Sequence, residues 1–251
     1  MRIKNNLNII FEDDYIIVLN KAFGMLTQMD KLKNTNNICS LVGSYLGLEY
    51  NNVHIINRLD RGVGGLVLIA KNKETAGILS NNLDDITKKY IVGVCNEGGK
   101  LKDQDELVNY LMKNQRLNVS KVVNKNSGGS KEARLKYKKI CDLNLNPKDV
   151  SSSGINISLL EVELLTGRHH QIRVQLSNAG FGIIGDKKYN NIKFDVGLSN
   201  TKNLCLLSNE LSFSHPATQK NVSLRLFKSM DIASINNLNK DNNLLNTLFN
   251  I

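Results

Sequence analysis

The stretch INRLDRGVGGLVLIAK, residues 56–71, joins a charged segment to an apolar run and bears on both fold and function. The run GLVLIA, residues 65–70, is typical of a buried β-strand. Just before it, Asp60 lies between Arg58 and Arg61, and the glycines that follow leave room above the carboxylate. In an extended backbone, Arg58 and Asp60 share one face and Arg61 points to the other. The stretch fits either a structural ion pair at the start of a strand or a carboxylate held ready for a ligand.

Further apolar runs along the chain predict a sheet with few helices. Helical spacing is found at 73–83 and at 169–180, which closes on a glycine, and the polar segment 142–156 predicts a loop. Strands with interspersed helices and no regular βαβ alternation indicate an α+β fold with a mixed, mainly antiparallel sheet. The runs that predict strands are 7–11, 15–20, 88–96, 133–140, 157–165, 204–208, 210–216 and 221–227.

The charge balance points to a polyanionic partner. The 251 residues include 33 Lys and Arg against 23 Asp and Glu, a net charge of +10. This favours nucleic acid first and an acidic membrane surface second, although a basic surface kept for solubility is the alternative. No apolar run approaches the ~20 residues of a membrane span, and the N-terminus is too acidic for a signal peptide. The four cysteines are scattered, which predicts reduced thiols and a cytoplasmic protein.

A second segment, LLTGRHHQIRVQLSNAGFGIIGDKKY at 164–189, predicts a strand that leads into a helix. The first turns of this helix would carry Arg168, His169, His170 and Arg173. A helix start with cations offers N–H groups and positive charge to a phosphate or carboxylate. The two histidines would point about 100° apart on a helix with no carboxylate at a ligand spacing, so no metal site is expected. A capped helix with a satisfied histidine is the alternative.

Together the segments resemble a known family. With NKAFGM (20–25), KKYIVGV (88–94), KEARLKY (131–137) and FSHPA (213–217), they look like the successive signatures of the RluA branch of the pseudouridine synthases, over about residues 8–228. The resemblance implies one catalytic domain at 1–233, with a mixed, mainly antiparallel sheet in two halves, flanking helices and a central active cleft. Residues 234–251 are expected to form an Asn-rich tail or short helix. The small N-terminal RNA-binding domain of many relatives is expected to be absent.

The implied reaction is the isomerisation of uridine to pseudouridine in structured ribosomal or transfer RNA. Asp60 matches the essential carboxylate, which stabilises the sugar, traps it covalently or takes its 2′ proton. Arg173 matches the arginine that pairs with this acid. Tyr90 matches the aromatic residue that stacks on the extracted uracil and helps remove the proton from carbon 5. The resemblance implies a monomer with no cofactor, metal or membrane. Arg58, which matches a residue that assists base flipping, is expected to bind substrate together with Arg61, Arg168, His170 and Lys21.

The sequence departs from the family pattern at several positions. Asn57 stands where His is common, and Val63-Gly64 where Thr-Ser is usual. Ala22, Gln175 and Gly182 replace a usual proline, histidine and proline. These changes bear on substrate choice more than on the reaction. They leave one alternative, a catalytically silent RNA-binding or ribosome-assembly factor on the same scaffold. A membrane-surface protein is disfavoured because the chain lacks a clear basic amphipathic helix.

Overall fold

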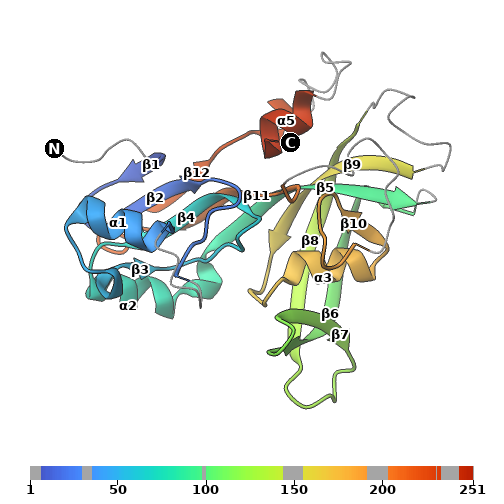
Figure 1. The fold of residues 1–251 in the computed structure, drawn as a ribbon, viewed down its shortest axis with the longest axis horizontal. Coiled ribbons are helices and arrows are strands. Elements are labelled where there is room, and N and C mark those ends of the chain that lie inside the picture. The colour runs from blue at the N-terminus through green and yellow to red at the C-terminus, as the bar shows by residue number, and fades with distance from the viewer. Residues whose placement is uncertain are drawn as a thin grey trace. The chain divides into compact units, whose positions relative to one another are not determined.

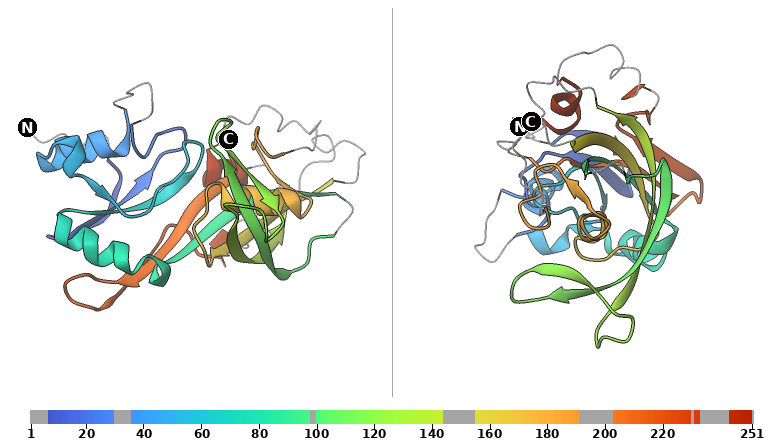
Figure 2. Two further views of the ribbon diagram at one scale, coloured as in Figure 1. Left: turned by 90° about the horizontal axis from the view of Figure 1, so that it is seen from below. Right: turned by 90° about the vertical axis from the view of Figure 1, so that its right-hand side faces the viewer.

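The structure of the protein is a computed structural model that describes residues 7–29, 36–97, 100–143, 155–190, 203–229, 231–232 and 243–250. The chain divides into two compact units, each described by itself below. The first unit comprises residues 1–87 and 208–226, and the second comprises 88–207 and 227–251. Both are built on mainly antiparallel strands with few helices (Figures 1 and 2). The α+β fold class expected from the strand pattern is confirmed.

The strands of the first unit neighbour one another in the order β1, β2, β4, β11 and β12, and β3 also pairs with β4. Every register given for these pairs is antiparallel. Asparagine side chains begin both helices: Asn37 accepts the Ser40 N–H at 3.0 Å and Asn72 accepts the Thr75 N–H at 2.8 Å. The elements are β1 (Ile9–Glu12), β2 (Ile16–Lys21), α1 (Ile38–Leu46), η1 (Tyr50–Asn52), β3 (His54–Ile55), β4 (Gly64–Ala70), α2 (Lys73–Asn81), η2 (Leu83–Asp85), β11 (Leu206–Ser214) and β12 (Asn221–Arg225).

The core of this unit lies on one face of its strands. Alternate residues of β2 and β4 point to the same face because strand side chains have a period of two. They pack there with residues from α2 and β11. Gly65 has φ +107°, and a Cβ on it would lie 2.2 Å from the Ser208 carbonyl oxygen. Only glycine lets these two backbones approach so closely. The buried core residues are Ile16, Val18, Leu66, Leu68, Ala70, Leu79, Ile86, Leu211 and Phe213.

The second unit is a sheet in the order β5, β9, β8, β6 and β7, with β10 paired to β5, all antiparallel. Helix α3 packs on it through Val174, which joins Leu111 and Ala133 in a small buried cluster. The Gln175 side chain donates to the carbonyl oxygens of Leu107 and Ala133 at 3.0 and 3.1 Å. The elements are β5 (Thr87–Glu97), β6 (Gln104–Asn114), β7 (Val119–Val123), β8 (Lys131–Asp142), β9 (Ile155–Leu164), α3 (Gln171–Asn178), β10 (Phe181–Ile183) and α5 (Asn243–Phe249).

Two sequence expectations fall partly outside the described residues. Most of the expected loop at 142–156, residues 144–154, lies outside the described residues. In the segment 234–251, only 243–250 is described, and it contains α5. The Asn203 side chain donates hydrogen bonds to the carbonyls of Phe249, the last residue of this helix, and of Asn250, which follows it. Its apolar side chains are buried: Leu244, Leu245, Leu248 and Phe249.

Candidate active site

Asp60 lies in a segment that is clamped from two sides. The Asn57 side chain accepts the Leu68 N–H at 2.6 Å and donates to the Leu66 carbonyl at 3.1 Å. The Asn57 side chain therefore makes two hydrogen bonds to the backbone of β4, as the backbone of one more residue in β3 would do. The Thr27 hydroxyl donates to the Leu59 carbonyl at 2.7 Å and accepts the Leu59 N–H at 3.2 Å. These contacts fix the backbone immediately before Asp60, and they give Asn57, a departure from the family pattern, a structural role.

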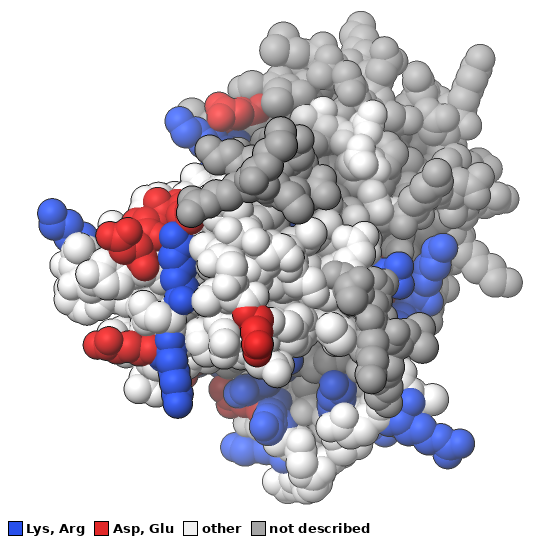
Figure 3. Space-filling view, turned by 60° about the vertical axis from the view of Figure 1, so that its left-hand side comes forward, with Lys and Arg blue, Asp and Glu red and all other residues white. Residues whose placement is uncertain are grey.

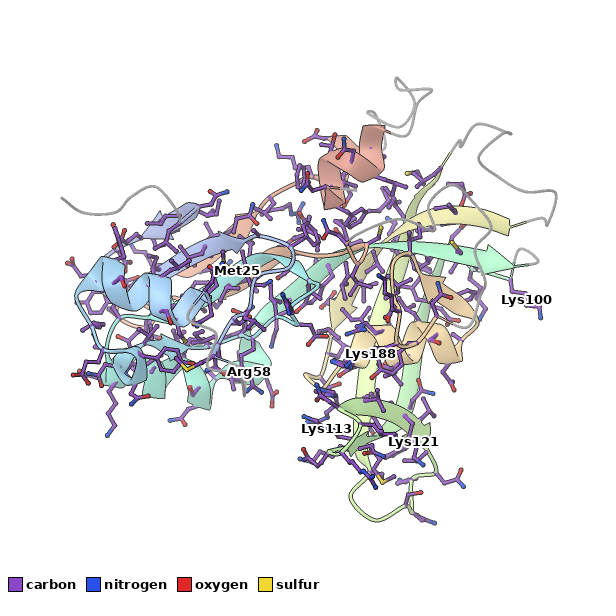
Figure 4. The ribbon with its side chains drawn as sticks, in the orientation of Figure 1. Met25, Arg58, Lys100, Lys113, Lys121 and Lys188 are labelled. Atoms are coloured by element: carbon purple, nitrogen blue, oxygen red, sulfur yellow. The ribbon has the colours of Figure 1, made fainter. Side chains whose placement is uncertain are left out.

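The segment then turns sharply into β4. The Val63 N–H donates to the Asp60 carbonyl at 3.0 Å. The Arg61 side chain donates to the Gly24 carbonyl at 3.1 Å. A Cβ at Gly64, where the family usually has Ser, would lie 2.7 Å from the Phe23 ring, so a side chain here would require the ring to shift. Asp60 is half-buried, whereas Arg58 (labelled in Figure 4) and Arg61 are exposed.

Lys21 is buried close to this carboxylate. Its ammonium donates to the carbonyls of Ala22 and Met25 at 3.1 and 2.7 Å, and the residue is 1% exposed. Burial lowers the pKa of Lys21 to about 8, and the negative charge of Asp60 opposes this shift. Lys21 is therefore a buried cation that interacts with Asp60 inside the first unit.

Tyr90 and Arg173 belong to the second unit. Tyr90 lies on β5 opposite Val162 of β9 and is 7% exposed. Arg173, on α3, donates from Nε to Asp186 Oδ2 at 2.7 Å and from Nη2 to Asp186 Oδ1 at 2.8 Å. Its guanidinium carbon lies 5.1 Å from the centre of the Tyr189 ring. Asp186 and Tyr189 thus hold the guanidinium by its edge and by its face.

The pair of Arg173 and Asp186 is charged. Burial alone raises the pKa of Asp186, but the bonds and charge of Arg173 outweigh it and leave the pKa below its ordinary value. The backbone N–H groups of Lys188 and Tyr189 also donate to Asp186 Oδ1, at 2.9 and 3.2 Å. Sequence reasoning did not single out Asp186, although it lies in the quoted GDKKY. An ion pair between residues 13 apart in the chain, such as Arg173 and Asp186, leaves no periodic pattern in the sequence.

The expected geometry of the two histidines was wrong. Helix α3 begins at Gln171, and His170 is its cap residue with a left-handed φ of 55°. The rings of His169 and His170 stack with centroids 3.8 Å apart instead of diverging. Gln171 accepts the Arg168 N–H at 2.9 Å, which fixes the helix start. The Arg168 side chain donates to the Glu132 carbonyl at 2.8 Å.

The candidate residues therefore divide between the units. The first unit contains Lys21, Arg58, Asp60 and Arg61, and the second contains Tyr90, Arg168, His170 and Arg173. Among the described residues, no group of three or more His, Cys, Asp or Glu side chains could hold a metal ion. In the same part of the chain, no helix is both long and apolar enough to cross a membrane.

Known proteins are similar to this chain over most of its length. The sequence profile described as RNA pseudouridylate synthase matches residues 15–178. The ribosomal large subunit pseudouridine synthase C of Rickettsia bellii is 30% identical over 218 residues, which cover 86% of this chain and 66% of that protein. An uncharacterized RNA pseudouridine synthase of Mycoplasma genitalium is 31% identical over 250 residues, 90% of this chain and 71% of that protein. The chain thus spans about two thirds of the length of these relatives.

A solved structure is similar as well. The human RNA pseudouridylate synthase domain containing 4 has a TM-score of 0.66 and 21% identity, with 91% of each chain covered, which supports the fold. The chain belongs to the RNA pseudouridylate synthase family, in its RluA branch. The expected enzyme class, an RNA-uridine isomerase, is confirmed at the level of this family.

Proposed function

We propose that this chain is an active pseudouridine synthase that converts uridine to pseudouridine in structured RNA. One observation carries the proposal: the family match spans residues 15–178 and so includes Asp60, Tyr90 and Arg173. A relative named for the large ribosomal subunit favours ribosomal RNA as the substrate class, with transfer RNA as the second class to be tested. The protein would act as a monomer in the cytoplasm, without cofactor or metal.

Asp60 is the proposed reactive carboxylate. Cleavage of the bond between uracil and ribose creates positive character at the sugar, which a carboxylate stabilises, traps or relieves by taking the 2′ proton. The clamps at Asn57 and Leu59 hold the backbone of this residue, so its position costs little to organise during the reaction. Lys21 supplies a nearby positive charge that interacts with the negative charge of this carboxylate.

The second unit would supply the groups that handle the base. Tyr90 would stack on the flipped uracil and help remove the proton from carbon 5. Arg173, whose guanidinium is also held by Asp186, would pair with the Asp60 carboxylate and hold it in position. The exposed Arg58 and Arg61 would contact phosphates and assist the flipped nucleotide.

The test is the Asp60→Asn variant, assayed by release of tritium from carbon 5 of labelled uridine in RNA. Asparagine keeps the shape but removes the charge and the nucleophile, so turnover should fall below detection. RNA affinity should stay within about tenfold, or ~1.4 kcal/mol, because transition-state interactions contribute little to ground-state binding. Asp84→Asn, an exposed carboxylate in the same unit, is the matched control and should retain activity.

Two outcomes would contradict the proposal. Wild-type protein that binds RNA tightly but never releases tritium would support the catalytically silent factor instead. Substantial turnover by Asp60→Asn would make the carboxylate structural. Mapping pseudouridines across total RNA with and without the gene would identify the substrate and decide between ribosomal and transfer RNA.

A further inference from the structure

The end of the β6 and β7 strands is strongly basic. Residues 113–131 contain five Lys or Arg and no Asp or Glu. All five cations are exposed. Basic side chains gather at the lower end of Figure 3, the end at which Figure 1 shows β6 and β7. Such a surface fits the phosphates of RNA. We call residues 113–131 the basic arm; its cations are Lys113, Arg116, Lys121, Lys125 and Lys131.

The basic arm is tied to the loop that follows β10. The Ser120 N–H donates to the Tyr189 hydroxyl at 2.8 Å, from the outer edge of β7. The Lys188 ammonium donates to the Asn118 carbonyl at 3.2 Å. Figure 4 shows Lys188 near Lys113 and Lys121 of the arm. The loop that contains Tyr189 therefore lies against the arm.

Tyr189 also contacts the family arginine. Its ring faces the Arg173 guanidinium at 5.1 Å, and its backbone N–H donates to Asp186, the ion-pair partner of Arg173. The ring packs beside the buried cluster of Leu111, Ala133 and Val174. One residue thus joins the arm, through its hydroxyl, to Arg173, through its ring.

The hydroxyl of Tyr189 bonds to two neighbours. A backbone N–H can only donate, so the oxygen of Tyr189 accepts from Ser120. The second neighbour is His170 Nδ1, 2.7 Å away, which accepts the Tyr189 proton when this nitrogen carries no hydrogen and donates to the oxygen when it does. The His170 ring meets the Tyr189 ring edge-on, with centroids 5.5 Å apart. A shift of Ser120 changes the best direction of this hydroxyl and so bears on the ring that faces Arg173.

We propose that Tyr189 is a positioning residue that couples RNA binding on the basic arm to the orientation of Arg173. This rests on the proposed function, since it assumes an RNA substrate. Phosphates on the arm would order β7 and Ser120, and the hydroxyl of Tyr189 would carry that order to its ring. RNA held elsewhere on the protein would then meet a less well-oriented Arg173, so the arm serves turnover as well as affinity.

The first test is a double-mutant cycle on single-turnover rates at saturating RNA. Tyr189→Phe keeps the ring and its packing but removes the hydroxyl, so the rate should fall about tenfold with little change in KM. Lys113→Gln with Lys121→Gln should weaken RNA binding and lower the saturated rate about threefold. In the Tyr189→Phe background, the same lysine changes should weaken binding but leave the rate unchanged. Rate effects that multiply independently would overturn the proposal.

Tyr110→Phe is the matched control. The Tyr110 hydroxyl, on β6, donates to Glu132 at 3.1 Å, and within the described part of the chain no hydrogen bond joins it to Arg173. Removal of the Tyr110 hydroxyl should leave the single-turnover rate as in the wild type, and the Lys113→Gln and Lys121→Gln changes should lower that rate as they do in the wild type. Ser120→Ala removes the hydroxyl that bonds His169 but keeps the N–H that bonds Tyr189, so it should preserve the coupling. Loss of coupling in Ser120→Ala but not in Tyr189→Phe would assign it to His169 instead.

The second test does not depend on activity. The Nε–H of Arg173, bonded to Asp186, gives a nitrogen-edited NMR signal that can be assigned with Arg173→Lys. A uridine-free RNA hairpin should shift this signal in the wild type and in Tyr110→Phe, and much less in Tyr189→Phe. The same shift in a protein that forms no pseudouridine in uridine-containing RNA would refute the proposed function but keep the coupling. Normal activity with equal shifts in all three proteins would refute the coupling alone.

Discussion

Arg173 and Asp186 form a two-point ion pair within the second unit, with side chains only 10% and 1% exposed. Asp186→Asn would remove the negative charge that Asp186 places against the buried guanidinium. We expect the free energy of unfolding at pH 7 to fall by about 3 kcal/mol, as for other broken buried pairs. Urea titration measures this, with Asp103→Asn, an exposed carboxylate in the same unit, as the control expected to change little. Equal stability of the two variants would contradict the prediction.

The same pair has a defined pH dependence. The folded pKa of Asp186 is lowered, so its stabilisation is complete above the unfolded pKa of about 3.9 and is lost as pH falls through the folded value. The stability difference between wild type and Asp186→Asn should therefore stay constant from neutral to mildly acidic pH. It should shrink only below the unfolded pKa.

Thr27 provides a test of the clamp beside Asp60. Its buried hydroxyl serves both the N–H and the carbonyl of Leu59, so Thr27→Val leaves two backbone groups unpaired. Stability should fall by about 1–3 kcal/mol. Turnover per folded molecule should also fall, because Asp60 loses its fixed position. Thermal unfolding and tritium release measure the two effects, and the exposed Thr218→Val should show neither. Full turnover in Thr27→Val would show that Asp60 is held by other contacts.

Several elements could be predicted from the sequence because their environment is simple. β4 is buried along its whole length, and its apolar run indicates this directly. β6 was not predicted because its residues are half-covered on both faces, so no clean alternation marks it. Helix α1 and strands β7 and β10 were likewise not predicted.

For the site, the sequence indicated the residue types but not their contacts. The helical pattern at 169–180 could not show that His170 has a left-handed backbone and stacks on His169. Nor could it show that Tyr189 reaches Ser120, 69 residues earlier in the chain. Such pairings depend on tertiary structure, in which loop and strand edge are brought together by the sheet, and leave no local periodicity.

Affinity for RNA should depend steeply on salt. If phosphate contacts dominate, the logarithm of the binding constant falls by about 0.7 per neutralised phosphate for each unit of log salt on single strands. Lys113→Gln with Lys121→Gln should reduce the magnitude of the slope by ~1.4 in filter binding. The control is Lys136→Gln with Lys138→Gln, exposed cations of the same unit that lie opposite Glu163 and Glu161. A wild-type slope near zero would contradict the prediction.

The C-terminal helix should contribute stability rather than chemistry. Leu244, Leu245, Leu248 and Phe249 of α5 are at most 4% exposed. Deletion of 234–251 should therefore cost several kcal/mol, at about 1.5–3 kcal/mol per buried apolar side chain. Turnover per folded molecule should stay within about threefold. Leu245→Ala should be destabilised, whereas the exposed Asn246→Ala should not. A loss of turnover as deep as that of Asp60→Asn would place the helix in the site.

The buried Lys21 allows a direct test of its interaction with Asp60. Its pKa of about 8 should stand apart from the ~10.4 of ordinary lysines in an NMR titration of labelled side chains. Because the unfolded chain keeps this proton to higher pH, unfolding free energy should rise with pH between the two values. Asp60 raises the pKa of Lys21, so Asp60→Asn should lower the titration midpoint, while Asp84→Asn should leave it unchanged. A midpoint that does not move in Asp60→Asn would show that the charges of Lys21 and Asp60 are not coupled.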